Sequence, residues 1–397
     1  EKVLTQLSAA LNSAGKTAKA LSISATSGTF VITNQNGEPI ADAAMYNDGR
    51  ATSVLNRAQA RINESAIVGP YFLANTPEYV IAFLSNTPLN QIPTDTSHSL
   101  KIGVNLEQIC YTADALSKAE SLNLKLPTLT LPGTKLANLD SRLASKFGFE
   151  QIPIYAGMTD GCTAQISAAR SSGCVTSLGT TMVIKAVGNK NISGPSFYSH
   201  LLPKGKYLAG GASNIGGISY KQFASDIDNW NLKATKHGPA TTVCYPLPGV
   251  GERFPFLAPT MSALQTAPFA SEVEQFRSIM EAIAFTERYS YELLSKAGAQ
   301  ISDQIFTVGG GGKSDFLSQL RATVMNKQVV TMANSGSDIG AALLAYAATI
   351  TQDLDLAAAL DHVLIAQTKQ FNPQKDQQDA LERNYQKFLV LTSKYIS

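Results

Sequence analysis

Residues 305–324 read IFTVGGGGKSDFLSQLRATV. The first four are apolar or β-branched and predict a buried strand. The later apolar residues recur at helical spacing and predict a helix: Phe316, Leu317, Leu320 and Val324. Between the two stand four consecutive glycines, Gly309–Gly312, which we call the glycine run. A strand that passes through a short loop into a helix is typical of α/β proteins, whose ligands bind at such loops.

The glycine run has two interpretations. Backbone amides without side chains can approach a phosphate closely, and the N-terminus of the following helix adds partial positive charge. Gly312-Lys313-Ser314 resembles the end of a Walker A loop, but Thr307 stands where that motif requires its first glycine. The alternative is a tight turn from strand to helix. Four glycines exceed what a turn requires, so the sequence favours a nucleotide contact of another architecture.

A second passage from strand to helix contains an aspartate. Residues 152–156 predict a strand, 162–170 predict a helix of small residues, and Asp160 lies between them. A carboxylate at the carboxyl end of a strand is well placed to act as a general base, and the helix dipole favours its ionised form. Aspartate is also a common N-cap, and the local sequence alone favours that simpler role.

Two polar turns are further candidates. Residues 177–181, Ser-Leu-Gly-Thr-Thr, offer hydroxyls at the tip of a predicted hairpin, where phosphate or a metal-bound water can bind. Residues 47–50, Asn-Asp-Gly-Arg, offer a carboxylate and a guanidinium, which suit a polyol or a sugar. Each stretch by itself is more typical of an ordinary turn. Their order along the chain is more informative: a polar turn, an aspartate after a strand, a Gly-Thr hairpin and a glycine run.

The rest of the pattern predicts two domains, 1–150 and 151–397. A mainly helical stretch at 78–147 gives way near residue 150 to a second run of strands. Other predicted helices are 1–12, 51–61, 276–297 and 339–348. Other predicted strands are 19–26, 29–33, 40–46, 173–178, 182–187 and 329–332, with Asn36-Gly37 as the turn between 29–33 and 40–46.

Composition excludes several classes of protein. The chain has 397 residues, 44% of them apolar, so it is long enough for two domains and is not disordered throughout. Lys and Arg number 32 against 30 Asp and Glu, and a net charge of +2 argues against nucleic-acid binding. No apolar run reaches about 18 residues, so no membrane span is predicted. The four cysteines and four histidines show no metal-site spacing, and so few thiols favour a reducing compartment.

The collinear segments resemble the FGGY family of carbohydrate kinases, relatives of actin and of the heat-shock chaperone ATPases. The resemblance covers nearly the whole chain, and its segments are weak singly but specific as an ordered set. Residues 44–50 resemble the sugar-contacting WNDGR segment, 126–134 the LP…PGT stretch, 155–164 the segment of the catalytic aspartate, 177–181 the second phosphate loop, 251–255 the GERxP segment, 281–285 the EGIAF helix and 308–317 the GGGAKSxLW adenosine loop.

The resemblance implies an α/β fold of two actin-like (ribonuclease H-like) domains flanking a catalytic cleft. The first, 1–150, would bind a small-molecule sugar, and the second, 151–397, would bind ATP with Mg²⁺. No metal ligand is assigned. The implied site residues are Asp160 as the catalytic base; Asp48, Thr26 and Ser27 for the sugar; and Gly179, Thr180, Gly310, Gly311 and Ser314 for ATP.

One departure from the family bears on the substrate. Xylulokinases carry a Met-His pair in a QMHG segment, where this chain has Ala25-Thr26-Ser27-Gly28. Small hydroxyl residues replace a histidine that could donate to the sugar. This favours a ketopentose other than D-xylulose, and the nearest set is the D-ribulose kinases of cyanobacteria and plants. A D-xylulose kinase, and a catalytically silent member that binds sugar or nucleotide, are the alternatives.

The second departure is at the start of the chain. The family opens with a strand carrying D-x-G-T, the first phosphate loop, and nothing before residue 20 matches it. We therefore expect the first strands of the N-terminal domain to precede Glu1 in a longer protein. The expected location is the cytoplasm, or the plastid stroma for a plant protein. The sequence leaves the oligomeric state open.

Overall fold

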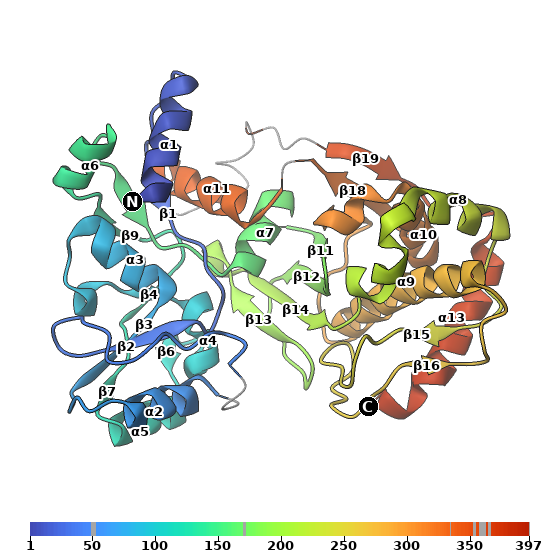
Figure 1. Cartoon of the computed structure of the whole chain (residues 1–397), viewed down its shortest axis with the longest axis horizontal. Helices are drawn as coiled ribbons and strands as arrows, with labels where there is room; N and C mark the ends of the chain where they lie inside the picture. The colour runs from blue at the N-terminus through green and yellow to red at the C-terminus, as the bar shows by residue number, and fades with distance from the viewer. Residues whose placement is uncertain are drawn as a thin grey trace. The chain divides into compact units, whose positions relative to one another are not determined.

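The structure is a computed structural model that describes residues 1–396 apart from 49–52, 170–171, 334, 352–354, 357–362 and 364–366. It contains two compact units (Figure 1). Unit 1 comprises Glu1–Ser167, His200–Gly205 and Ser337–Val363, and unit 2 comprises Ala168–Ser199, Lys206–Gly336 and Leu364–Ser397. A single boundary near residue 150 does not reproduce these units, because the chain returns to unit 1 late in the sequence.

Unit 1 is built from short strands and helices. Its helices are α1 Lys2–Ser13, α2 Val54–Glu64, α3 Thr76–Ser85, α4 Thr96–Gly103, α5 Ala113–Ser121, α6 Ser141–Phe147, α7 Asp160–Ala169, whose last two residues belong to unit 2, and α11 Ser337–Ile350. Its strands are β1 Leu21–Ser22, β2 Phe30–Thr33, β3 Tyr71–Asn75, β4 Thr94–Asp95, β5 Val104–Asn105, β6 Cys110–Tyr111, β7 Leu124–Lys125, β8 Leu129–Thr130, β9 Lys135–Asn138 and β10 Pro153–Tyr155.

Strand pairing in unit 1 brings two distant segments together. β1 pairs in parallel with β10, and β10 pairs antiparallel with β9, while β2, β3 and β7 form a second small sheet. Because β1 and β10 run in the same direction, the residues that follow them, 23–28 and 156–160, leave the sheet at the same edge. Gly157 permits this approach, since a Cβ at that position would lie 1.9 Å from the Ile23 carbonyl oxygen.

Unit 2 contains one long mixed sheet. Its strand order is β13-β14-β12-β11-β17-β18-β19. The strands are β11 Cys174–Leu178, β12 Met182–Gly188, β13 Tyr198–Leu201, whose last two residues belong to unit 1, β14 Tyr207–Ser213, β17 Gln304–Val308, β18 Gln328–Met332 and β19 Gln367–Phe371, with β15 Cys244–Tyr245 and β16 Leu264–Gln265 as a separate pair. The helices are α8 Ile227–His237, α9 Glu272–Lys296, α10 Asp315–Met325 and α13 Gln378–Thr392.

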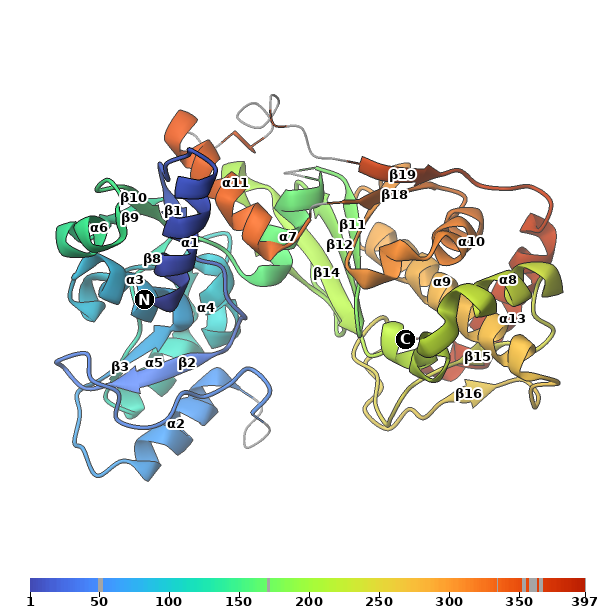
Figure 2. The same ribbon diagram turned by 45° about the horizontal axis from the view of Figure 1, so that its top comes forward.

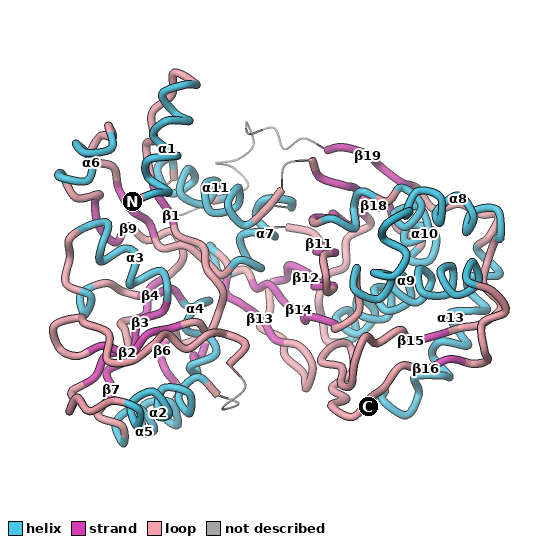
Figure 3. Tube along the Cα trace, in the orientation of Figure 1, coloured by secondary structure: helices cyan, strands magenta, loops and turns pink. Residues whose placement is uncertain are grey.

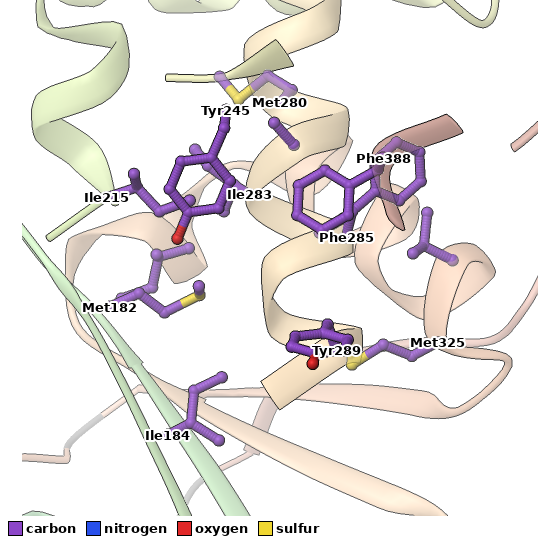
Figure 4. Packing of buried hydrophobic residues seen from close by; sticks show 14 of the residues in the cluster. Met182, Ile184, Ile215, Tyr245, Met280, Ile283, Phe285, Tyr289, Met325 and Phe388 are labelled. Atoms are coloured by element: carbon purple, nitrogen blue, oxygen red, sulfur yellow. The ribbon is translucent and has the colours of Figure 1, made fainter. Parts of the chain in front are cut away.

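Helix α9 is the centre of the core of unit 2. It packs against α8, α10 and α13, which lie beside it in Figures 1 and 2, and against β12. Its Met280, Ile283 and Phe285 are almost fully buried, and Figure 4 shows them facing Ile215, Tyr245 and Phe388. Most of this 25-residue helix is buried, including the charged side chains of Arg277, Glu281 and Glu287.

Most predicted elements are confirmed, and Figure 3 shows them along the trace. The strand predicted at 40–46 is wrong. Ile40 N donates to Ile32 O at 3.0 Å, and Ala44 N donates to Phe30 O at 2.9 Å. Ile40 and Ala44 are four residues apart, whereas their partners in β2 are only two residues apart. This mismatch breaks the ladder into isolated bridges. The strand predicted at 19–26 is reduced to β1 and one bridge between Ala25 and Thr159.

Two further findings concern membrane spans and the state of the cysteines. None of the helices in the described part of the chain is long and apolar enough to cross a membrane. The four cysteines are free thiols, and all but Cys110 are buried.

Candidate functional site

Asp160 is the first residue of α7 and is exposed. Its backbone N donates to the Ala25 carbonyl oxygen at 3.1 Å, which joins the start of α7 to the segment after β1. Its Oδ1 accepts from the amide of Gly161, the next residue, at 2.8 Å. An N-cap carboxylate instead accepts from amides two or three residues ahead. Asp160 therefore does not form the simple N-cap that the local sequence favours, and its carboxylate faces outward.

The segment Ala25–Gly28, which we call the hydroxyl loop, lies beside Asp160 through this contact. Thr26 Oγ1 lies 2.9 Å from Thr29 Oγ1, and Thr29 Oγ1 accepts from Tyr46 N at 3.1 Å. Ser27 Oγ is buried and has no hydrogen-bond partner among the described residues. A buried hydroxyl without a partner is costly, and a bound polar ligand removes that cost.

Asp48 lies near two arginines of α2, and one of them, Arg57, also lies close to Gly28 of the hydroxyl loop. The Asp48 side chain is only 12% exposed, and its Oδ2 lies 3.7 Å from Arg61 Nη2. Arg57 donates through Nη1 to the Met45 carbonyl at 2.5 Å. Burial lowers the pKa of Arg57, and the nearby Asp48 carboxylate opposes that shift. Gly49 and Arg50, which complete the predicted polar turn, lie outside the described residues.

The sequence reasoning did not single out Arg57, Arg61 or His98. The arginines lie four residues apart on a predicted helix next to the polar turn, and this spacing was the available signal. For His98 no local signal existed. Its Nε2 lies 3.2 Å from the Ala25 carbonyl oxygen, a contact across 73 residues that only the tertiary structure creates.

In unit 2, the turn Gly179–Thr181 joins β11 to β12. Gly179 and Thr180 are both exposed at its tip. Their carbonyl oxygens accept from Gly217 N at 2.8 Å and Ile218 N at 3.1 Å. Gly217 must be glycine, because a Cβ there would lie 2.7 Å from the Gly179 carbonyl oxygen. The Gly179 amide donates across the turn to the Thr181 carbonyl oxygen at 3.0 Å, and Gly179 and Thr180 remain exposed.

A buried glutamate holds the segment that supports this turn. Glu252 accepts from Ser213 Oγ at 2.8 Å, from Tyr245 OH at 2.7 Å and from Asn214 N at 2.8 Å. Burial and the negative charge of Glu252 raise the pKa of Tyr245 well above its usual range. The phenol therefore remains a donor at all physiological pH values, and the network fixes the chain just before Gly216.

The glycine run lies against the same turn. Gly309 has a φ of +91°, and a Cβ there would lie 2.8 Å from the Leu178 carbonyl oxygen. A Cβ at Gly311 would lie 2.4 Å from Leu178 Cγ. Packing thus explains these two glycines. At Gly310 a Cβ would meet no heavy atom of the described chain within 4 Å, so this residue leaves open space for another molecule.

We expect the two central glycines to respond differently to substitution. Gly311→Ala should lower the free energy of unfolding by about 1–3 kcal/mol, because its methyl group overpacks Leu178. Gly310→Ala should unfold at nearly the wild-type temperature but raise the KM for ATP severalfold, because the methyl group occupies the open space. Thermal unfolding and ATP titration of both variants check this, and equal unfolding temperatures would contradict it.

Ser314 ends the loop by capping α10. Its Oγ accepts from Leu317 N at 3.2 Å and lies 3.5 Å from Asn231 Oδ1 of α8. The Ser314 hydroxyl therefore has a structural role at the start of α10. Its predicted contact with adenosine stays a prediction.

The described residues contain no group of three or more His, Cys, Asp or Glu side chains arranged to hold a metal ion. Mg²⁺ in phosphoryl-transfer sites is bound by substrate phosphates, waters and one or two carboxylates. Such a site needs no cluster of protein ligands.

Comparisons with known proteins identify relatives of this chain. Residues 174–349 match the model of the C-terminal domain of the FGGY family of carbohydrate kinases. The xylulose kinase of Staphylococcus epidermidis is 24% identical over 430 aligned residues, which cover 97% of this chain and 84% of that protein.

Two solved structures show the fold. The ligand-bound xylulose kinase of Lactobacillus acidophilus has a TM-score of 0.83 at 20% identity, covering 100% of this chain and 88% of its own. The Plasmodium falciparum glycerol kinase with ADP has a TM-score of 0.81 at 16% identity, with the same two coverages. The fold is α/β and is that of the FGGY kinases, which have two actin-like domains.

The predicted segments, the family match over residues 174–349 and these likenesses point to the same conclusion. Residues 174–349 belong to the FGGY family of carbohydrate kinases, and the chain is a sugar-kinase phosphotransferase.

Proposed function

We propose that this enzyme transfers the γ-phosphoryl group of ATP to the terminal hydroxyl of a ketopentose, D-ribulose, and produces D-ribulose 5-phosphate. The observation that carries the proposal is the hydrogen bond from Asp160 N to Ala25 O, which holds an exposed carboxylate beside the hydroxyl loop. The partnerless Ser27 Oγ and the nearly buried Asp48 supply polar groups for a sugar in the same unit.

The mechanism assigns each group one step. Asp160 accepts the proton of the terminal hydroxyl, and that oxygen forms a bond to the γ-phosphorus while the bond to the bridging oxygen of ADP breaks. Asp48, Thr26 and Ser27 hold the sugar so that its terminal oxygen lies in line with the breaking bond. Such catalysis consists mainly of positioning and charge stabilisation.

The nucleotide is assigned to unit 2. Gly179 and Thr180 bind phosphate through the exposed tip of their turn. Gly310, Gly311 and Ser314 line the adenosine side, with Gly310 supplying the open space. Mg²⁺, bound to the phosphates, would offset their negative charge.

A panel of sugars tests the choice of substrate. With ATP, we expect kcat/KM to be highest for D-ribulose, and lower for D-xylulose, L-ribulose and glycerol. Ser27→Ala should raise the KM for D-ribulose about tenfold, the loss expected for one hydrogen bond, without changing the KM for ATP. Coupled measurement of ADP release gives both constants.

Thr33→Val is a matched control. Thr33 Oγ1 is another buried hydroxyl without a partner among the described residues of unit 1, but it lies in β2, away from the hydroxyl loop. The names of the S. epidermidis and L. acidophilus proteins favour D-xylulose as the second candidate substrate. A clear preference for D-xylulose in the panel would make D-xylulose the substrate in place of D-ribulose. Binding of sugar without release of ADP would indicate a catalytically silent member of the family.

A further inference from the structure

Unit 1 contains a buried group of polar side chains that the proposed chemistry does not use. Asp95 ends β4 and caps α4, and His98 lies in the first turn of α4. Both side chains are almost fully buried, at 2% and 0% exposure. His98 Nδ1 contacts Asp95 Oδ2 directly. A buried charged pair of this kind is costly unless every polar atom is satisfied, so its partners are informative.

The other nitrogen of His98 has its own partner. Nε2 lies 3.2 Å from the Ala25 carbonyl oxygen, which also accepts from Asp160 N at 3.1 Å. One carbonyl of the hydroxyl loop thus joins His98 to the backbone of Asp160.

Asp95 also reaches the start of α7 by a second route. Its Oδ1 accepts from Ser97 Oγ at 2.5 Å, and Ser97 Oγ accepts from Thr159 N at 2.9 Å. Two hydrogen-bonded chains therefore lead from one carboxylate to adjacent residues, Thr159 and Asp160. Asp95 and His98 together fix the position and direction of the first turn of α7.

The geometry also indicates the charge of His98. A carbonyl oxygen can only accept a hydrogen bond, and so can an ionised carboxylate. Both ring nitrogens must then carry a proton, which makes the ring an imidazolium. Neutral His98 donates from one nitrogen only, and one of the two contacts is lost.

We propose that His98 is a positioning residue, an imidazolium clamped by Asp95 that holds the Ala25 carbonyl and so aligns Asp160 with the hydroxyl loop. The inference rests on the proposed role of Asp160. It also makes the activity depend on pH, because deprotonation of His98 releases the Ala25 carbonyl and loosens both the hydroxyl loop and the first turn of α7.

The charged and titratable neighbours of His98 set the direction of this control. Burial by itself lowers the pKa of His98, but the Asp95 carboxylate and, from α3, Glu78 outweigh it, so that the pKa is raised. Burial, together with Asp95, raises the pKa of Glu78 to about 7, although His98 opposes this. Tyr111 from β6 faces the same carboxyls, and burial raises its pKa. The ion pair of His98 and Asp95 stabilises the folded state at pH values below the ordinary histidine pKa. This stabilisation is lost as the pH rises through the raised pKa of His98.

Kinetics of three variants test the proposal. His98→Phe, which removes both contacts, should lower kcat about 100-fold, a loss typical of a misplaced catalytic group, and leave the KM for ATP within twofold. His98→Gln retains an amide that can donate to Ala25 O and should keep a third or more of the activity. His200→Gln, a substitution at another buried histidine, should lower stability at most.

The pH profile separates positioning from a purely structural role. Wild-type kcat/KM for the sugar should fall at alkaline pH. This alkaline limb should be absent in His98→Gln, and should shift to lower pH in Glu78→Gln, because the loss of that negative charge lowers the pKa of His98. An unchanged limb in His98→Gln, or a kcat for His98→Phe within threefold of wild type, would overturn the proposal.

Hydrogen exchange gives a readout that does not depend on activity. The amide of Asp160 should exchange at least tenfold faster in His98→Phe than in wild type, and at nearly the wild-type rate in His98→Gln. If the wild type phosphorylates no sugar, the proposed function fails while this measurement still decides the positioning role. If His98→Phe does not fold, the pH profile and the hydrogen exchange of His98→Gln decide whether His98 is a positioning residue.

Discussion

Asp160→Asn is expected to lower kcat for sugar-dependent ATP turnover about 1000-fold, within the range for loss of a general base. Asn has nearly the same shape and can still accept from Gly161 N, as Asp160 does at 2.8 Å. It cannot take the proton of the sugar hydroxyl. The KM values for sugar and ATP should change little, because the backbone contact from Asp160 N to Ala25 O remains. Steady-state kinetics with a coupled assay measures the effect.

Asp140→Asn is the matched control for this prediction. Asp140 lies in the same unit at the start of α6, where its Oδ1 accepts from Arg142 N and Leu143 N at 3.1 and 3.4 Å. Asn caps helices as well as Asp does, so this variant should keep its activity. If Asp160→Asn remains within a few-fold of wild type, Asp160 is not the base.

Arg321→Met should give the largest loss of stability, about 3–5 kcal/mol in the free energy of unfolding, because it leaves a buried charge unpaired. Arg321 and Glu287 are both fully buried and form two hydrogen bonds of 2.6 Å. Glu287 also accepts from Thr176 of β11 at 2.5 Å, and Arg321 donates to Thr307 of β17 at 3.0 Å. The pair thus joins α9 and α10 to the two strands that end at Gly179 and at the glycine run.

Two controls separate burial from charge pairing itself. Lys369→Met breaks the ion pair with Asp315, which also measures 2.6 Å but whose side chains are 54% and 56% exposed, and it should cost less than about 1 kcal/mol. A double variant, Arg321→Met with Glu287→Leu, should recover much of the loss, because it leaves no unpaired charge. Urea unfolding measures all three, and equal losses for Arg321→Met and Lys369→Met would contradict the argument.

Several features were predictable because their signals are local. β17, the glycine run and α10 follow from a short apolar run, four glycines and helical spacing within 20 residues, and the hairpin of β11 and β12 follows from its strand pattern and central glycine. The strand predicted at 40–46 failed for a non-local reason. The Asn36-Gly37 turn indicated a returning strand, but the pairing register with β2 slips by two residues between Ile40 and Ala44.

The sequence by itself determined the order of elements and the chemistry of the candidate residues, because glycine conformation, capping and hydrophobic periodicity depend on near neighbours. Only the tertiary structure decided what those residues contact. Parallel pairing of β1 with β10 carries Ala25 to Asp160, and α4 then presents His98 to the same carbonyl. These contacts join residues 73 to 135 positions apart, and folding creates them by burying polar groups whose hydrogen bonds must be completed inside the protein.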